Sequence, residues 1–347
     1  MINVGVAGIG FMGMIHYLAY QKVRGAKVAA ICTRNRKKLA GDWRGIQGNF
    51  GPPGKKMDLG KAKRYREFDD LLADAKIDLI DLCLPPAMHA EMAIRALRAG
   101  KHVVCEKPIA LKTSDARRMV RAARRARKQL LIAHVLPFFP EYAFALKAIQ
   151  SGRYGQVLRA HFKRIIAEPR WIKDFFDADV VGGPVVDLHI HDAHFIRLAI
   201  GMPRRVYSRG RMRGNVVEFL HSQFLFDRDN LLVSAESGVI AQQGRPFTHA
   251  YEIQLEKATL LFDFAVIGDR PVMAMPVTLL GSGGRVTHPR LGSGDPIDAF
   301  VAELNEVSKS IRSGRRSKLL DGGLANDALV MCHKQTQSIK NHRAVGF

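Results

Sequence analysis

The densest group of chemically active side chains lies in the segment GGPVVDLHIHDAHFIRL, residues 182–198. Carboxylates and imidazoles at close spacing could hold a metal ion or move a proton to and from a substrate. If the segment is a strand, Asp187, His189 and His191 share one face. If it is a helix, Asp187, His191 and His194 line up instead. Asp187 and His191 share a face in both cases, so this pair is the main candidate for acid/base chemistry.

A second candidate site lies at the N-terminus, where VGVAGIGFMG places glycines at positions 8, 10 and 13. This G-x-G-x-x-G triplet follows an apolar run and opens a helical pattern, the context in which it binds a dinucleotide. Gly8 allows a tight turn, Gly10 lets the backbone approach a pyrophosphate, and Gly13 allows close packing of helix on strand. The helix N-terminus, with Phe11 and Met12 in its first turn, would present free N–H groups to the phosphates.

The end of the second predicted strand bears on the choice of cofactor. An NAD site usually has a carboxylate about 20 residues beyond the fingerprint, where it binds the ribose 2′-hydroxyl. This chain has ICTRNRKKLA there, with Thr33, Arg34 and Arg36 and no acid before Asp42. Arginine and a hydroxyl would bind a 2′-phosphate. The sequence therefore predicts NADP, with NAD as the alternative if these arginines are ordinary surface charges.

The elements that must position these groups alternate between strand and helix in the first third of the chain. Such alternation indicates an α/β fold with a doubly wound parallel sheet. The segment 41–63 is rich in Gly, Lys and Pro and is predicted as a long loop. The predicted strands are 2–8, 27–32, 78–84, 102–105 and 130–134, and the predicted helices are 12–24, 67–75, 88–99 and 113–128.

Beyond residue 130 the pattern becomes that of an α+β domain. Alternating runs at 156–166, 218–226 and 251–264 indicate strands of a largely antiparallel open sheet. Helical spacing returns at 296–312 and 321–340. We predict an NAD(P)-binding Rossmann domain over 1–128 and an α+β domain over 129–347, whose final helix could pack back on the first domain.

The composition excludes several classes of protein. The chain has 54 Lys and Arg against 32 Asp and Glu, a net charge of +22. The basic residues are threaded with apolar ones, as in DARRMVRAARRARKQ (115–129), which is typical of the solvated face of an amphipathic helix. No zinc-finger spacing, aromatic RNA-binding motif or leucine zipper occurs, so a nucleic-acid partner is not expected.

The cysteines and the N-terminus bear on the cellular setting. The four cysteines have no C-x-x-C spacing, and three lie in apolar runs, so a disulfide framework is not expected. No run approaches the roughly 18 apolar residues that span a bilayer. The N-terminus lacks the features of a signal peptide, so the cytoplasm is the expected location and no membrane partner is expected.

The stretch LPPAMHAEMAIRALRAGKHVVCEKPIAL, residues 84–111, resembles the Gfo/Idh/MocA oxidoreductases, named for glucose-fructose oxidoreductase and inositol dehydrogenase. The order of motifs matches over nearly the whole chain: the glycine fingerprint, PPAMH, AGKHVVCEKP, GGPVVDLHIH and the closing DGGLANDALVMCHKQTQS. The resemblance implies an NAD(P)-dependent dehydrogenase or reductase. It would transfer hydride between the nicotinamide and a carbinol or keto carbon of a sugar, polyol or sugar derivative.

The resemblance also implies roles for individual residues. Lys107, in the Glu-Lys-Pro motif, would lie at the nicotinamide, where its ammonium can stabilise a developing alkoxide. Asp187 and His191 match the family's Asp-x-x-x-His, in which the histidine is the acid/base and the aspartate can orient its ring. These three are the expected catalytic residues. The expected cofactor-binding residues are Gly8, Gly10, Phe11, Met12, Gly13, Thr33, Arg34, Leu84, Pro85, His89, Glu106 and Lys107.

The chain departs from the family pattern after the catalytic pair. Relatives often have an aspartate three residues beyond the histidine, where this chain has His194, and His189 is also extra. A metal site from Asp187, His189, His191 and His194 is chemically possible. It would need a geometry that neither periodicity provides for all four residues, so no metal is expected.

The substrate contacts are predicted from a loop and a strand. In AHVLPFFPEY (133–142) two phenylalanines stand where many relatives carry a basic or amide residue. They would form either an apolar wall of the substrate pocket or a pair of core aromatics. The expected substrate contacts are Phe138, Arg164, Trp171 and His194.

Two other functions and one assembly remain open at this point. An enzyme of the same fold could cleave glycosides with a permanently bound NAD, and a non-catalytic sensor could keep only the dinucleotide fold. If relatives guide assembly, the outer face of the C-terminal sheet would join a homodimer or homotetramer.

Overall fold

The computed structural model describes residues 1–48, 50–170, 174–292 and 294–347. The chain divides into two compact units: Met1–Phe139 with Ser293–Asn326, and Pro140–Gly292 with Asp327–Phe347. The sequence-based boundary at residue 128 falls inside the first unit, before β6, the edge strand of its sheet. Over the described part of the chain, no helix combines the length and the apolar character needed to cross a bilayer.

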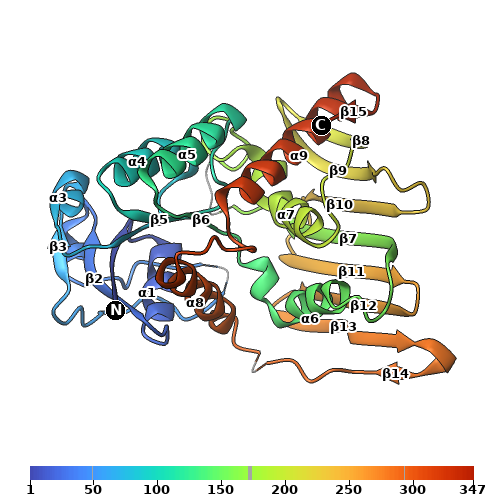
Figure 1. Ribbon diagram of the computed structural model, residues 1–347, viewed down its shortest axis with the longest axis horizontal. Helices are drawn as coiled ribbons and strands as arrows, with labels where there is room; N and C mark the ends of the chain where they lie inside the picture. Colours follow the sequence, from blue (N-terminus) through green and yellow to red (C-terminus); the bar gives the residue numbers. More distant parts are fainter. Residues whose placement is uncertain (49, 171–173, 293) are drawn as a thin grey trace. The chain divides into compact units, whose positions relative to one another are not determined.

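The first unit contains a six-stranded sheet in the order β3-β2-β1-β4-β5-β6 (Figure 1). Every neighbouring pair is parallel, which confirms the predicted doubly wound sheet. The strand order reverses between β1 and β4, the place where open α/β sheets bind ligands. The strands are β1 Ile2–Ala7, β2 Ala26–Cys32, β3 Lys63–Tyr65, β4 Leu79–Leu82, β5 His102–Glu106 and β6 Leu130–Ala133.

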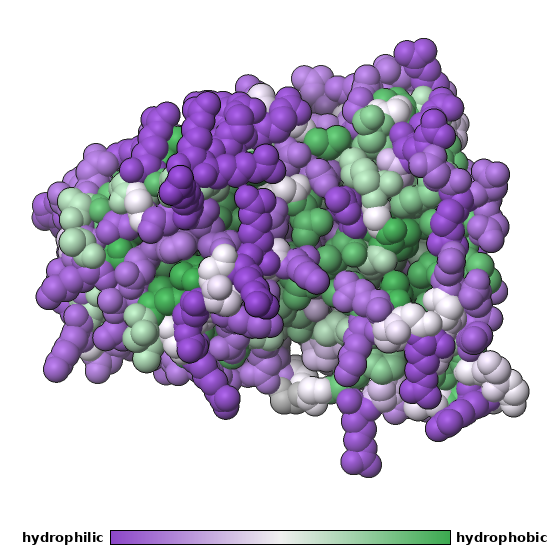
Figure 2. Space-filling model, viewed as in Figure 1, coloured by the Kyte–Doolittle hydropathy of each residue, from purple (hydrophilic) through white to green (hydrophobic). Residues whose placement is uncertain are grey.

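Two pairs of helices pack together in this unit, α1 with α8 and α4 with α5 (Figure 1). On α5 only Ala116, Met119 and Ala123 are buried, and its arginines are exposed, as the amphipathic pattern predicts. Hydrophilic side chains accordingly gather over α4 and α5 in Figure 2. The helices are α1 Phe11–Tyr20, α2 Arg36–Leu39, α3 Phe68–Ala73, α4 Pro86–Arg98, α5 Thr113–Ala126 and α8 Ile297–Ser313, with a 3-10 turn, η1, at Leu136–Phe138.

The predicted loop of residues 41–63 is irregular but anchored. Trp43 is fully buried, stacks edge-on against Tyr17 of α1, and donates its indole N–H to the Lys38 carbonyl at 2.8 Å. Ile46 and Leu59 are also buried in the core of this unit. The loop ends in β3, a short strand that the sequence pattern did not reveal.

The second unit contains a nine-stranded sheet in the order β14-β13-β12-β11-β7-β10-β9-β8-β15 (Figure 1). All pairs are antiparallel except β7 with β10, which confirms a largely antiparallel sheet. The predicted run 251–264 belongs to two strands, because the chain turns at Glu256 and Lys257. The strands are β7 Val157–Ala167, β8 Arg205–Arg213, β9 Val216–Leu225, β10 Leu232–Ile240, β11 Phe247–Leu255, β12 Ala258–Ile267, β13 Arg270–Gly281, β14 Val286–Thr287 and β15 Val345–Gly346.

Three helices cover one face of this sheet. Phe195 of α7 (Ile190–Ala199) packs on Phe162, and Tyr142 of α6 (Pro140–Gln150) packs on Tyr251. On α9 (Gly322–Asn341), Gln335 donates a hydrogen bond to Ser222. The covered face is marked by one row of buried residues across six strands: Ser208, Ser222, Ala235, Phe162, Tyr251 and Phe262.

The segment that opened the sequence analysis is helical. A turn of π-helix, η2, spans Val185–His189 and runs directly into α7. π-Helical turns are rare and occur frequently at functional sites. The helical alternative is therefore the one that the chain adopts.

Candidate active site

Lys107 is the only residue of 103–110 that is not buried. It directly follows β5, whose last residue is Glu106, and the peptide bond that joins it to Pro108 is cis. The burial of its neighbours fixes the backbone of the Glu-Lys-Pro motif. A partly exposed ammonium on a fixed backbone can hold a hydroxyl of a bound molecule.

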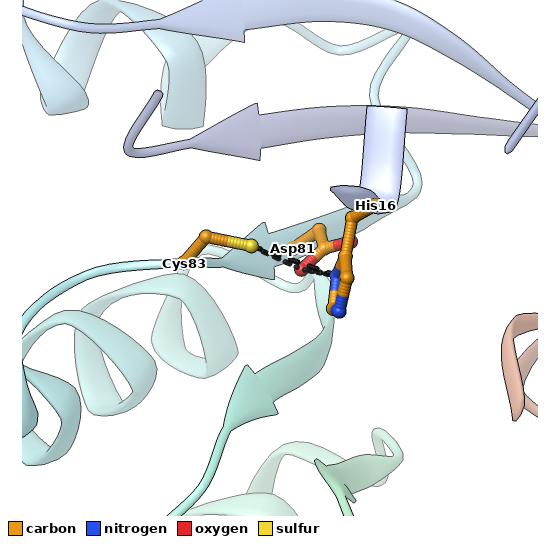
Figure 3. A group of neighbouring side chains, drawn as sticks. All are labelled: His16, Asp81 and Cys83. Atoms are coloured by element: carbon orange, nitrogen blue, oxygen red, sulfur yellow. Dashed lines mark hydrogen bonds and ion pairs between the residues drawn. The ribbon is translucent and has the colours of Figure 1, made fainter. Parts of the chain in front are cut away.

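Glu106 joins this motif to a buried polar cluster. Its Oε2 accepts the backbone N–H of Lys107 at 3.0 Å, and its Oε1 lies 3.1 Å from His16 Nε2, an ion-pair contact without hydrogen-bond alignment. His16 Nδ1 faces both carboxylate oxygens of Asp81 at 2.9 and 3.1 Å. Cys83 Sγ lies 3.4 Å from Asp81 and 3.5 Å from His16 Nδ1 (Figure 3).

The charges of this cluster follow from its burial and its partners. Burial lowers the pKa of His16, but the adjacent Asp81 carboxylate outweighs it, so the pKa is well above its usual 6.5. Burial raises the pKa of the Cys83 thiol beyond its usual range, so this side chain is neutral. Burial also raises the pKa of Glu303 on α8, which is fully buried in the same unit. The surroundings of His16 thus favour its protonated form.

His16, Asp81 and Cys83 form the group, among the described residues, whose ligand atoms are close enough to share a metal ion. Their chemistry fits a hydrogen-bonded ion pair better. His16 Nδ1 is hydrogen-bonded to Asp81, and Nε2 lies in ion-pair contact with Glu106, an arrangement that suits a protonated ring without a lone pair for a metal. We therefore assign no metal to these residues.

His89 connects the turn after β4 to the turn after β5. It is fully buried, and its ring nitrogens lie 2.7 Å from the Leu84 carbonyl and 2.8 Å from the Pro108 carbonyl. Burial lowers the pKa of His89 below its usual 6.5, while the hydrogen bonds to the two carbonyl oxygens act in the opposite direction. His89 is thus a structural bridge, while Leu84, which precedes α4, is partly exposed and Pro85 is exposed.

The glycine fingerprint has the geometry that a phosphate cradle needs. Gly8 has φ +95°, and a Cβ there would lie 2.3 Å from the Cys83 carbonyl oxygen. A Cβ on Gly13 would lie 2.0 Å from the Gly8 carbonyl oxygen. A Cβ on Gly10 would meet open space, and no side chain caps α1, whose first residues Phe11 and Met12 are partly exposed. The helix N-terminus can therefore receive an anion.

The end of β2 has the basic character that the sequence indicates. Thr33 is half-buried and accepts the N–H of Asn35 at 3.3 Å through its hydroxyl, while Arg34 is exposed. Asp42, the first acid beyond this strand, is held by Arg44 at 2.8 Å. The segment that follows β2 is thus basic and polar, with Arg34 exposed and no acid before Asp42.

Asp187 and His191 stand out in the second unit by their exposure. All the remaining residues of the segment 184–196 are buried. They lie one turn apart, Asp187 in the π-helical turn and His191 in the first turn of α7. The structure therefore brings this pair together on one surface of an otherwise buried helix, as an acid/base pair requires.

Buried polar contacts support this helix from behind. Arg164 of β7 is 3% exposed and binds Asp192 of α7 through two hydrogen bonds of 2.7 and 2.9 Å. His189 faces Gln335 of α9 at 2.9 Å, and burial lowers its pKa to about 4. Arg164 thus anchors α7, and its burial does not suit the substrate contact that the sequence predicts.

The other predicted substrate contacts differ in position. Phe138 is partly buried and packs against the core of the first unit. His194 is 1% exposed, in the core of the second unit. Trp171 lies outside the described residues.

Sequence reasoning missed His16, Asp81 and Asp192 as structural partners of the site. A signal for Asp81 was present, because a carboxylate inside the apolar run DLIDLCL requires a buried partner. The partner itself was not visible, since it is 65 residues away in the chain.

Two family profiles match this chain. One is described as an oxidoreductase family with an NAD-binding Rossmann fold and matches residues 2–134, and the other, the GFO/IDH/MocA C-terminal domain, matches residues 142–261. The chain belongs to the Gfo/Idh/MocA oxidoreductase family. The family resemblance drawn from the sequence is thereby confirmed.

Individual relatives are more distant. The 1,5-anhydro-D-fructose reductase of Ensifer adhaerens is 32% identical over 143 residues, which cover 41% of this chain and 43% of that protein. The myo-inositol 2-dehydrogenase of Thermotoga maritima is 26% identical over 200 residues, covering 58% and 55%. The chain thus spans about half the length of the curated relatives that it matches.

A solved structure of similar fold is the aldose-aldose oxidoreductase from Caulobacter crescentus in complex with glycerol. It has a TM-score of 0.80 and 20% identity and covers 100% of this chain and 99% of that one. At this identity the likeness concerns the fold.

Proposed function

We propose that this protein is an NAD(P)-dependent oxidoreductase that transfers hydride to or from a carbinol or keto carbon of a sugar, polyol or sugar derivative. The observation that carries the proposal is the partial exposure of three side chains in otherwise buried segments. Lys107 is partly exposed within 103–110, and Asp187 and His191 are partly exposed within 184–196. Buried polar contacts hold the Lys107 backbone and the helix that carries Asp187 and His191, as a site for proton transfer requires. The names of the relatives, a sugar-derivative reductase and a polyol dehydrogenase, support the substrate class.

Each of the three residues has its own role in the proposed reaction. The nicotinamide cofactor, when bound, supplies or accepts the hydride. His191 takes the hydroxyl proton during oxidation and returns it during reduction, and Asp187 orients or stabilises the charged ring. Lys107 binds the reacting oxygen and stabilises the negative charge that develops on it. His191→Asn or Lys107→Met should lower kcat by about 10²- to 10⁴-fold.

We propose NADP as the preferred cofactor, because Thr33 and Arg34 directly follow β2 and no acidic residue occurs in the sequence before Asp42. The test is a fluorescence titration of nucleotide-free protein with NADPH and with NADH. We expect tighter NADPH binding, weakened at least tenfold by Arg34→Asp. Arg98→Asp, at the exposed far end of α4, is the matched control and should leave both affinities unchanged.

The outcomes of the titration separate the alternatives. Preference for NADH would show that Arg34 is a surface charge. Failure of both nucleotides to bind would contradict the proposed function. If a nucleotide binds, oxidation of myo-inositol and reduction of 1,5-anhydro-D-fructose are the first assays. Release of an aglycone from a glycoside without added cofactor would favour glycoside cleavage instead.

We also propose that the uncovered face of the nine-stranded sheet joins a second copy of the chain. Tyr207 and Leu232 are 36% and 55% exposed there and line a hollow of about 390 Å³. Leu232→Arg should shift the sedimentation coefficient toward that of the monomer. An unchanged coefficient, or a monomeric wild-type protein, would contradict this assembly.

A further inference from the structure

The backbone of Lys107 is held through a chain of contacts that leads away from the proposed reaction site. The Lys107 N–H binds Glu106 Oε2 at 3.0 Å, Glu106 Oε1 lies 3.1 Å from His16 Nε2, and His16 Nδ1 binds Asp81 at 2.9 Å. Asp81 and His16 are fully buried, and Glu106 is 7% exposed. The chain links β5 to α1, the helix that begins at the glycine fingerprint, and to β4.

The contacts define the protonation state of His16. A neutral ring would turn a lone pair toward one of the two carboxylates, which is repulsive, whereas an imidazolium donates toward both. An imidazolium between two carboxylates also limits the negative charge buried in this core.

We propose that His16 is a positioning residue for Lys107: a buried imidazolium that fixes the Glu106 carboxylate and, through it, the backbone of Lys107. The groups facing or adjacent to it are Asp81 and Cys83 from β4 and the residue after it, Glu106 from β5, Tyr20 from α1 and Glu303 from α8. Among them Cys83, Tyr20 and Glu303 are neutral, because burial raises the pKa of each. His16 is therefore the cation that compensates the negative charge of Asp81 and Glu106. The inference rests on the proposed role of Lys107 and extends it to the group that holds Lys107 in place.

The first test needs no substrate. In protein labelled with ¹⁵N-histidine, two-bond ¹H–¹⁵N spectra at pH 7.5 distinguish an imidazolium from a neutral ring, and His16→Gln assigns the signal. We expect an imidazolium for His16. A neutral tautomer at pH 7.5 would overturn the proposal.

The second test measures the position of Lys107 directly. Lys107 and the exposed Lys112 are labelled together with trinitrobenzenesulfonate, and the peptides are quantified by mass spectrometry. His16→Gln should change the rate ratio of Lys107 to Lys112 at least threefold. The matched control is His102→Gln on β5, the strand that carries Glu106. The His102 ring accepts the Gln129 N–H, and its replacement should leave the ratio unchanged. An unchanged ratio in His16→Gln would overturn the proposal; if that variant does not fold, Glu106→Gln is labelled instead with the same criterion.

A kinetic readout applies once a substrate is found. In His16→Gln we expect kcat to fall about tenfold while the dissociation constant of the nucleotide stays within twofold. If the substitution only destabilised the fold, kcat and the affinity for the nucleotide would fall together. If no alcohol or ketone is turned over, the proposed function fails, and the labelling ratio still decides whether His16 positions Lys107.

Discussion

His16 and His189 are both fully buried histidines near an aspartate, one in each unit, yet they differ in charge. His16 binds Asp81 at 2.9 Å, and its pKa is raised well above 6.5. His189 lies 4.0 Å from Asp192, and burial lowers its pKa to about 4. The difference arises because Asp192 is already neutralised by Arg164, whereas among the described residues Asp81 forms its ion pair with His16. The charge of a buried histidine is thus decided by the other partners of its carboxylate.

The largest effect is expected from breaking the Arg164–Asp192 pair. Arg164→Met leaves Asp192 buried without compensation and should lower the free energy of unfolding by about 3–5 kcal/mol at pH 8. The loss should shrink toward pH 6, because His189 can then take a proton and compensate Asp192. Urea denaturation at both pH values measures this. Arg197→Met, which breaks the half-exposed pair with Asp327, is the control and should cost less than about 1 kcal/mol. A pH-independent loss would contradict the coupling.

The neutral state of His189 gives the next effect. Because its folded pKa is about 4 and its unfolded value about 6.5, the unfolded chain gains a proton first as the pH falls. The contribution of neutral His189 to the free energy of unfolding is present above pH 6.5 and is lost as the pH falls toward and through 4. Between pH 7 and pH 4 the wild-type protein should lose about 3 kcal/mol more than His189→Gln. Parallel curves of stability against pH would show that His189 does not titrate in this way.

His16 should show the opposite slope. Its folded pKa is raised, so its contribution is complete below pH 6.5 and is lost as the pH rises through the folded pKa. His16→Gln should be less stable than the wild-type protein by about 2 kcal/mol at pH 6, the size expected of hydrogen bonds to charged groups. The difference should narrow in alkaline solution, as measured by denaturation between pH 6 and pH 10. A difference that widens with pH would reverse the assignment.

The smallest effect is expected from removing the hydrogen bond to the uncharged His189. Gln335→Leu removes the hydrogen bonds to His189 and Ser222, which are uncharged, and should cost about 1 kcal/mol at pH 7. Thr336→Val, one residue along α9, removes a hydroxyl that binds only the Cys332 carbonyl and should be nearly neutral. Equal costs for the two variants would show that His189 does not depend on Gln335.

Several features of this protein followed from the sequence because their causes are local. The glycine fingerprint, the apolar runs of the parallel strands and the basic face of α5 each depend on residues within one or two turns. Asp187 and His191 were paired in advance, because both periodicities place them on one face. The π-helical turn that carries Asp187 had no such local signal.

The sequence by itself determined the alternation of β1, β2, β4, β5 and β6 with α1, α3, α4 and α5, the nucleotide fingerprint and the identity of Lys107, Asp187 and His191 as candidates. The tertiary structure alone decided which buried histidine carries a charge, that Arg164 serves Asp192, and that Glu106 reaches His16. These contacts join residues 28 to 90 positions apart. The physical reason is that periodicity reports which side of an element is buried, whereas the charge of a buried group depends on which distant side chain meets it there.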